Sequence, residues 1–453
     1  MNTWTMHVEK FGKIESADIE VAPMTLFVGD NNSGKSYIMT LIYGLINIAL
    51  YAKQYEIRTE SEDYIRCIKF VDRIHDNTDY MVNSFKSIEM TLDEMKAFEG
   101  VLNELLALNK DRFIRDLFNK RIDIGGLSLE LKKHNKYILR YNLSYMTNQE
   151  EYVTLQGISG KNKMMLEYCS NIERRESKYE HYQAILFILE YMIKGSFGDA
   201  TYFPTARTGY VLTFKSLIGS ALREKFNFDT TQKNLLTRPN SDFLIKLSEL
   251  TKSDLTDKEW RRSNRTQSAV RIIESNIIEG KISISDMPAH DIVYQPQGTD
   301  TQLPMFVASG VVTEMTPLLL FFRNDIVNTV LIEEPEISLH PQLQCEMARV
   351  LIRLANSRIP VFVTTHSDII LQHINNMIKL AAASNREAIG EKLGYEECDW
   401  IDREKVKVYQ FDMDSSQRTT VIKLPCGDFG FEAMTFYDTL EELNRQTRII
   451  EEE

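Results

Sequence analysis

The sequence contains few cysteines, and their spacing fits neither a zinc site nor a disulfide framework. Five cysteines occur among 453 residues, and no two are spaced as CxxC or CxxxC. Structural zinc sites and small secreted domains depend on such closely spaced pairs. The cysteine usage therefore argues against both classes and is typical of a protein from a reducing cytoplasm.

Long apolar runs and a basic charge excess are also missing. The two longest apolar stretches, IMTLIYGLINIALYA (38–52) and AILFILEYMI (184–193), are shorter than the roughly 20 residues that a membrane span needs. The first residues, MNTWTMHVEKFGKIE, hold no apolar signal core. The net charge of −12 is unlike that of a dedicated nucleic-acid wrapper, although a local basic patch can still bind DNA. We expect a cytoplasmic protein with no membrane partner.

What the sequence does have is enough apolar residues, 43%, for a large core. Alternating apolar and polar residues over 3–28 predict strands, and a helix should follow over 35–51. The last third predicts, in order, strand 329–333, helix 341–356, strand 360–365, helix 367–383 and strands 406–412 and 418–424. Alternating strands and helices favour a parallel sheet covered by helices. We therefore predict an α/β fold with a mostly parallel sheet, an N-terminal antiparallel β part and a largely helical insertion.

The same patterns predict a head that is interrupted by an insertion. Residues 1–51 and 196–430 are expected to form the head, which includes a short strand at 200–204. Residues 52–195 are mainly helical in pattern, carry many charges and contain a β-hairpin segment, so we expect an inserted arm. A C-terminal helix is expected over residues 431–453.

The stretch GDNNSGKS (29–36) matches the phosphate-binding pattern G-x-x-x-x-G-K-[ST]. Glycines let the backbone curl so that successive N–H groups point at phosphate oxygens, and the helix that follows adds its dipole. Lys35 should neutralise the β- and γ-phosphates of ATP, and Ser36 should offer its hydroxyl to Mg²⁺. The alternative is a glycine-rich surface turn. The candidate phosphate-binding residues are Gly29, Asn31, Asn32, Ser33, Gly34, Lys35 and Ser36.

Two adjacent glutamates, Glu333 and Glu334, end the apolar stretch TVLIEE. Adjacent acids raise each other's pKa unless a cation relieves the repulsion, and burying a carboxylate is costly without a partner. If this strand ends beside the phosphate-binding loop, Glu333 should lie near the Mg²⁺ ion. Glu334 should orient and deprotonate the attacking water. The alternative is an exposed acidic strand end.

A third candidate residue is His366, which follows the apolar strand VFVTT. The C-terminal ends of strands in a parallel sheet are where ligands bind. From that position the imidazole could donate to a γ-phosphate oxygen. The alternative is a polar residue whose hydrogen bonds are satisfied within the protein.

Taken together, the phosphate-binding loop, LIEEPEISLHP and TTHSD, in this order, resemble the heads of ABC-type ATPases. The resemblance is to the RecF/SMC/OLD branch and covers residues 1–50 and 200–380. It implies that FVASGVVTEMTPLL is the signature segment, so that Ser309 and Gly310 would contact ATP bound to another subunit. ATP would then be sandwiched between two copies of the chain and would act as a dimer switch. The transporter signature LSGGQ is absent, which makes a transporter subunit the least favoured reading.

The same resemblance implies roles for two other segments. SLHP (338–341) resembles a D-loop, and YFPTARTG lies where a Q-loop region falls, so Arg207 could sense nucleotide or a partner. No clear Q-loop glutamine is visible. Asp412 and Asp414 form a D-x-D pattern that is either a metal-binding loop or, as we favour, a polar hairpin turn.

The chain also resembles the ATPase subunits of bacterial anti-phage systems such as Septu and PARIS, through TYFPTARTG and THSDIILQHINNMIKL. That resemblance implies an ATPase in a homo-oligomer that holds and regulates a separate nuclease effector. Two alternatives remain open. One is a RecF-like DNA-repair ATPase, for which the arginines of EWRRSNRTQSAVR (259–271) could contact DNA unless they are a solvated helix face. The other is a nucleotide-binding scaffold with little turnover.

Overall fold

The chain forms two compact units. The computed structural model describes residues 2–76, 85–145, 151–159, 163–171, 177–195, 197–213, 216, 236–250, 265–285, 291–324, 327–433 and 444–450. One unit comprises Met1–Val21 and Leu41–Asp199, and the other comprises Ala22–Thr40 and Ala200–Glu453. The phosphate-binding loop therefore belongs by its contacts to the second unit. The head and arm boundaries expected from sequence differ from these and stay a prediction.

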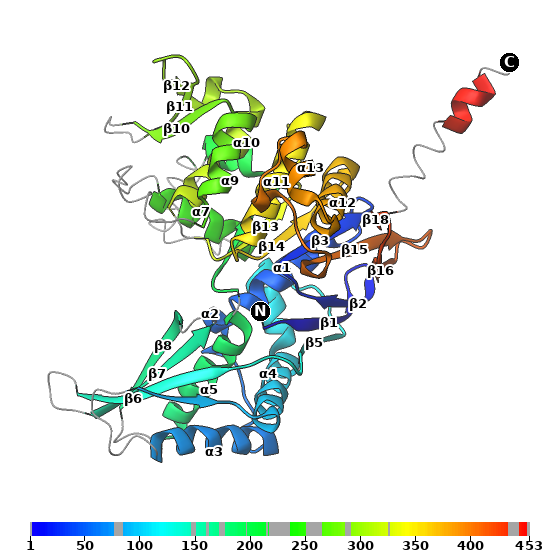
Figure 1. Cartoon of the computed structure of the whole chain (residues 1–453). Coiled ribbons are helices and arrows are strands. Elements are labelled where there is room, and N and C mark those ends of the chain that lie inside the picture. The colour runs from blue at the N-terminus through cyan, green and yellow to red at the C-terminus, as the bar shows by residue number, and fades with distance from the viewer. Residues whose placement is uncertain are drawn as a thin grey trace, which may run out of the picture. The chain divides into compact units, whose positions relative to one another are not determined.

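The first unit contains two groups of antiparallel strands and several helices (Figure 1). In one group β1 lies between β2 and β5, and in the other the order is β4-β6-β7-β8. Its strands are β1 (Trp4–Phe11), β2 (Ile14–Glu20), β4 (Lys86–Glu89), β5 (Gly126–Leu131), β6 (Ile138–Tyr145), β7 (Glu151–Ser159) and β8 (Lys163–Asn171). Its helices are α2 (Ala49–Ala52), α3 (Glu62–Asp76), α4 (Leu92–Phe118) and α5 (Lys178–Lys194). The insertion is thus helical in part and carries a four-stranded sheet as well.

Parallel strands form the centre of the second unit. Strands β3, β14, β13 and β9 run parallel in that order, β15 pairs parallel with β3, and β16 pairs antiparallel with β15. Every residue of β3, β13 and β14 is buried, as expected for strands covered on both faces. The bounds are β3 (Met24–Gly29), β9 (Ala200–Phe203), β13 (Thr329–Glu333), β14 (Val361–Thr364), β15 (Val406–Met413) and β16 (Thr419–Lys423).

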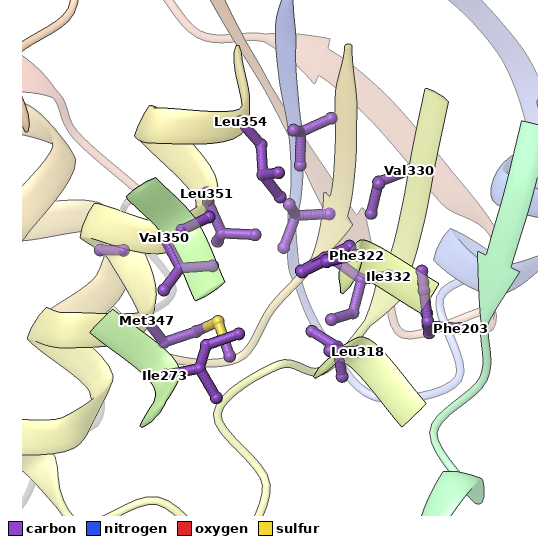
Figure 2. Close-up of a cluster of buried hydrophobic side chains, with 14 of the residues drawn as sticks. Phe203, Ile273, Leu318, Phe322, Val330, Ile332, Met347, Val350, Leu351 and Leu354 are labelled. Carbon is purple, nitrogen blue, oxygen red and sulfur yellow. The ribbon is translucent and has the colours of Figure 1, made fainter. Parts of the chain in front are cut away.

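Helices pack on these parallel strands through an apolar core. Figure 2 shows side chains from β9, β13, α10 and α11 directed into one cluster, among them Phe203, Val330, Ile332, Leu318, Phe322, Met347 and Leu351. The α-helices are α1 (Lys35–Ile46), which begins in this unit, α7 (Arg238–Leu250), α9 (Gln267–Ile272), α10 (Gly310–Arg323), α11 (Pro341–Asn356), α12 (Asp368–Ala382) and α13 (Arg386–Leu393). A π-helical turn, η2 (Ile273–Ile277), continues α9, and residues 444–450 are helical. Within the described parts of the chain, none of the helices combines the length and apolar character that crossing a bilayer requires.

Smaller elements complete the second unit. A three-stranded sheet contains β10 (Gly280–Ile284), β11 (Ile292–Pro296) and β12 (Leu303–Pro304), and a two-stranded one contains β17 (Cys426–Gly427) and β18 (Gly430–Phe431). Short 3₁₀ turns are η3 (Met305–Val307), η4 (Glu397–Asp399) and η5 (Arg403–Lys405). The predicted fold class, an α/β head with a mostly parallel sheet and an antiparallel N-terminal part, is confirmed.

Candidate nucleotide-binding site

The loop between β3 and α1 has the curled backbone that a phosphate-binding loop requires. Gly29, Asn32 and Gly34 all have positive φ angles, of 122°, 59° and 98°. At Gly29 an added Cβ would lie 2.3 Å from the carbonyl oxygen of Phe411 in β15, so only glycine fits there. The N–H of Asp30 donates to the same carbonyl at 3.2 Å. The end of β15 therefore fixes where the loop begins.

The ammonium group of Lys35 lies inside this loop. Its Nζ donates to the carbonyls of Gly29 at 3.1 Å and Asp30 at 2.6 Å. Burial lowers the pKa of Lys35 to about 8, against the opposing attraction of Glu334, Asp30 and Glu336. A desolvated cation among carboxylates attracts an anionic ligand strongly, because little water screens the interaction.

Glu333 is the last residue of β13, and its side chain is only partly paired. Its Oε2 accepts from both the N–H and the hydroxyl of Thr205, each at 3.2 Å. The hydroxyl of Tyr202 also hydrogen-bonds this carboxylate. Glu333 Oε1 is buried and, within the described parts of the chain, has no donor of good geometry. A buried carboxylate oxygen without a donor is available to a cation or to its bound water.

Glu334 has an unusual backbone, with φ at +43°. Its N–H donates to the carbonyl of Thr364 in β14 at 2.9 Å. Burial raises the pKa of its carboxyl, repulsion from Glu333 raises it further, and attraction to Lys35 and Arg207 opposes the rise. Left-handed backbone at a bulky residue is costly and persists only where neighbouring contacts hold it.

Arg207 holds the backbone of both glutamates from inside the protein. The arginine side chain has no exposed surface. Nη1 donates to the carbonyl of Glu333 at 2.7 Å, and Nη2 donates to that of Glu334 at 3.0 Å. Nε lies 2.7 Å from Oε2 of Glu314 in α10. Arg207 therefore cannot contact a partner directly, and the sensing role that its sequence position suggested would have to act through the residues that it holds.

Sequence reasoning assigned no role to Glu336, a third carboxylate at the same edge. Its Oε1 accepts from the backbone N–H of His366 at 2.6 Å, and the hydroxyl of Thr365 also hydrogen-bonds this carboxylate. Its Oε2 is buried and, among the described residues, has no donor of good geometry. Burial raises the pKa of Glu336. The signal was present in EEPE, where the third glutamate stands two residues after the pair.

His366 follows β14 and lies close enough to Lys35 for the charge of the lysine to affect the pKa of the imidazole. Burial lowers the pKa of His366, Lys35 lowers it further, and Asp30 opposes the change. The imidazole is therefore mostly neutral at pH 7, and one of its ring nitrogens carries a proton that it can donate. Lys35 lies close enough to Glu334 and to His366 to affect the pKa of each, and Glu333 adjoins Glu334.

The remaining predicted residues are exposed, with the exception of Ser33. Asn31, Asn32 and Ser36 are exposed, whereas Ser33 is buried with its hydroxyl donating to the carbonyl of Asp30 at 2.7 Å. Ser309 and Gly310 are exposed at the start of α10, where Ser309 Oγ accepts from the N–H of Val312 at 3.4 Å. Among the described residues, no hydrogen bond or ion pair joins Ser309 or Gly310 to the loop 29–36.

The residues present fit a magnesium-bound triphosphate. Mg²⁺ in nucleotide enzymes takes one or two protein groups together with phosphate oxygens and water. The hydroxyl of Ser36 and the unpaired oxygen of Glu333 would hold the ion, and Lys35 and the loop N–H groups would hold the phosphates. Among the described residues, there is no group of three or more His, Cys, Asp or Glu side chains that could hold a metal ion.

Of two other sequence candidates, one is a turn and the other lies largely outside the described residues. The D-x-D pattern is a hairpin turn, in which Asp414 Oδ1 accepts from the N–H groups of Ser416 at 2.8 Å and Arg418 at 2.9 Å. Most of the basic stretch 259–271, including Arg261 and Arg262, lies outside the described residues. Within it, Arg265 donates to Asn328 Oδ1 at 3.2 Å and is therefore engaged inside the protein.

Comparisons with known proteins agree with this geometry. The AAA ATPase domain family (AAA_15) matches residues 1–371. No curated protein matches the chain. A solved SMC head domain from Thermotoga maritima is 11% identical, with 94% of this chain and 100% of that chain covered and a TM-score of 0.31. An Smc head with an extended coiled coil, bound to the C-terminal domain of ScpA and derived from Pyrococcus furiosus, is 12% identical, with coverage of 98% and 100% and a TM-score of 0.35.

Proposed function

Because the chain belongs to the AAA ATPase domain family, we propose that it binds ATP with Mg²⁺ and hydrolyses ATP to ADP and phosphate. One observation carries the proposal. The lysine of the phosphate-binding loop and the carboxylates of Glu333 and Glu334 meet at the same edge of parallel strands, with His366 beside them. This is the edge where ligands bind in open α/β sheets.

Each residue then has a role set by its surroundings. Magnesium, when bound, neutralises charge on the phosphates. Ser36 and Glu333 would hold it, and Lys35 would hold the β- and γ-phosphates. Glu334 would take a proton from the attacking water, and its raised pKa makes it a better base than an ordinary carboxylate. His366 would donate a hydrogen bond to the γ-phosphate.

The exposed start of α10 supports a site that two subunits complete. A helix N-terminus attracts anions through its free N–H groups and its dipole. Ser309 and Gly310 are exposed and are not joined to the loop of their own chain in the described residues. We therefore propose that they contact the γ-phosphate of ATP on another copy, so that ATP favours a dimer or higher oligomer.

The resemblance to Septu and PARIS subunits extends the proposal to a cellular role. In that role the chain is the ATPase of a bacterial anti-phage complex in the cytoplasm. Its oligomer would hold a separate nuclease effector, and nucleotide occupancy or turnover would control that effector. A stable complex with a nuclease encoded nearby is the expected result of purification from the native host.

Turnover of ATP by the purified protein tests the biochemical part. We expect Mg²⁺-dependent phosphate release that Glu334→Gln reduces by about 100-fold or more, while binding of a non-hydrolysable ATP analogue persists and the Glu334→Gln oligomer becomes more stable with ATP. Nucleotide binding without turnover by the parent protein would favour the scaffold alternative. Turnover that rises with DNA and binding that weakens with salt would favour the RecF-like alternative. Parent-level turnover by Glu334→Gln would refute the base assignment.

A further inference from the structure

One buried guanidinium joins the two segments that the proposed reaction needs. The glutamate pair follows β13, and the exposed Ser309 and Gly310 begin α10. These segments are not adjacent in sequence, yet both are tied to Arg207.

At the first end, Arg207 controls the backbone of the proposed base. Glu334 has a positive φ of 43°, its N–H is held by Thr364 and its carbonyl is held by Arg207 Nη2 at 3.0 Å. The same guanidinium donates to the carbonyl of Glu333 at 2.7 Å. Conformations of this kind relax when the contacts that hold them are removed. The direction of the Glu334 carboxylate therefore depends on where the guanidinium lies.

Arg207 and its neighbour Thr208 also contact Glu314, which lies in the first turns of α10. Arg207 Nε lies 2.7 Å from Glu314 Oε2, and the hydroxyl of Thr208 donates to Glu314 Oε1 at 2.5 Å. Thr313, the preceding residue, donates through its hydroxyl to the carbonyl of Gly310 at 2.9 Å. A displacement of the α10 N-terminus would thus carry Glu314 and the guanidinium with it.

We propose that Arg207 and Glu314 are a positioning pair that transmits the position of the α10 N-terminus to the backbone of Glu334. The proposal rests on the proposed ATPase function. Contact of Ser309 and Gly310 with nucleotide on another subunit would move α10, and the pair would adjust the angle of the proposed base. Hydrolysis would then depend on assembly although neither Arg207 nor Glu314 touches nucleotide.

The chemistry of arginine suits this role. Its planar fork points nitrogens in fixed directions, so that here it donates to the carbonyls of Glu333 and Glu334 while Nε forms an ion pair with Glu314. Lysine has one charged nitrogen at the end of a flexible stem and cannot make these three contacts in a fixed geometry. A change of Arg207 to lysine would therefore keep the charge and lose the positioning.

The test uses the full-length variants Arg207→Met, Arg207→Lys and Glu314→Gln with Arg353→Met as the matched control. Arg353 is also a buried, ion-paired arginine, with 5% of its side chain exposed, but it pairs with Asp399 away from the site. We expect each of the three site variants to lower kcat by roughly 100-fold, the size of effect that small misplacements cause. Affinity for a non-hydrolysable ATP analogue with Mg²⁺ should stay within about threefold of the parent value. In free energy, a threefold change is less than half of a tenfold change. Arg353→Met should lower Tm and leave kcat per folded molecule unchanged.

A second readout does not depend on turnover. Hydrogen exchange in the nucleotide-free protein should rise in the site variants at residues 309–316 and 329–339 and stay as in the parent protein elsewhere. The double variant Arg207→Met with Glu314→Gln should be no slower than the worse single variant, because the two groups act as one unit. Glu314→Gln keeps the side-chain shape and serves if Arg207→Met does not fold.

The outcomes separate this inference from the proposed function. If the parent protein does not hydrolyse ATP, the proposed function fails, and the exchange pattern alone decides whether the two segments are coupled. If the parent is active, parent-level kcat in folded site variants would overturn the inference. An even rise of exchange over the whole unit, as a merely structural pair would give, would overturn it as well.

Discussion

Two clusters of buried arginines in the second unit differ in what they hold. Arg207 directs two of its hydrogen bonds at backbone carbonyls beside the proposed site. In the other cluster, Arg353 Nε donates to Asp399 Oδ1 at 2.7 Å, and Arg349 Nη2 donates to Asp399 Oδ2 at 2.8 Å. That cluster fastens the turn η4 to helix α11 mainly through side-chain ion pairs, and the carbonyl to which Arg353 donates, that of Ser268 at 3.3 Å, does not belong to a predicted site residue.

The difference suggests two functions: Arg207 positions the backbone of the glutamates, whereas the cluster of Arg349, Arg353 and Asp399 (the attachment cluster) attaches one element to another. A carbonyl bond fixes a backbone angle, so its loss changes the direction of the side chain on that residue. A bond to a carboxylate at the end of a side chain fixes only the distance between two elements. We therefore expect the first cluster to affect chemistry and the second to affect stability, although both are buried ion pairs whose breakage is costly.

The largest expected effect comes from removing another buried cation, Lys35. This change tests whether a buried charge serves to bind the ligand, in contrast to the charges of both arginine clusters. Lys35→Met should weaken binding of ATP with Mg²⁺ by about 100-fold or more, since two factors of ten equal roughly 2.7 kcal/mol. Because burial already lowers the pKa of Lys35 to about 8, the folded protein loses little by giving up this charge. Calorimetry should show lost affinity with a Tm near that of the parent. A large drop in Tm would place Lys35 with the attachment cluster.

The next largest effect is expected when the cluster of Arg349, Arg353 and Asp399 loses its carboxylate. Asp399→Asn leaves Arg349 and Arg353 without their buried counter-charge, and loss of one partner of a buried pair costs about 3–5 kcal/mol. Denaturant unfolding of the second unit should show this loss. Turnover per folded molecule should stay at the parent value, and a selective fall in kcat with unchanged stability would contradict the division between the clusters.

Acid should weaken the attachment cluster in the parent protein. Burial alone would raise the pKa of Asp399, but hydrogen bonds from Arg353 and Arg349 outweigh it and hold the pKa below its usual value of 3.8. The stabilisation is present above that value and is lost as the pH falls through the lower, folded-state pKa. Unfolding at a series of pH values should therefore show the parent and Asp399→Asn converging below pH 3.8. A gap that stays constant down to pH 2 would show that ionisation of Asp399 is not the cause.

The smallest effect concerns the second contact to α10. Thr208→Val removes one hydroxyl that donates to Glu314 and keeps the shape of the side chain. A single such hydrogen bond contributes about 1 kcal/mol, so we expect kcat to fall about fivefold or less with ATP affinity unchanged. Thr213→Val, at an exposed hydroxyl that bonds only within its own turn, is the control and should leave kcat unchanged. Equal kcat in both variants would confine the coupling to Arg207.

Local patterns predicted the elements of the site well. Strand 329–333 and helix 341–356 have the same bounds as β13 and α11, and strand 360–365 exceeds β14 by one residue at each end. These elements are marked in sequence by apolar runs and by Pro341 at the helix start. The glycine and lysine pattern likewise predicted the loop, because its chemistry lies in eight consecutive residues.

Contacts between distant residues could not be predicted in the same way. Arg207 meets Glu333 across 126 positions, and Thr208 meets Glu314 across 106, so no local pattern records either contact. In the insertion, the consecutive strands β6, β7 and β8 pair antiparallel, as a hairpin pattern predicts, whereas the pairing of β5 with the distant β1 leaves no local signal. A C-terminal helix was expected over residues 431–453; residues 444–450 are helical, Phe431 lies in β18, and residues 434–443 lie outside the described residues.

The backing of Gly29 by Phe411 has a consequence for synthesis on the ribosome. At roughly 5–20 residues per second, about 20–80 s separate the emergence of these two residues. Until then the nascent chain lacks β15, which pairs with the full length of β3. The family match ends at residue 371, before this strand. A nascent chain released before residue 406 would carry every loop residue and still lack the wall against which the loop is shaped.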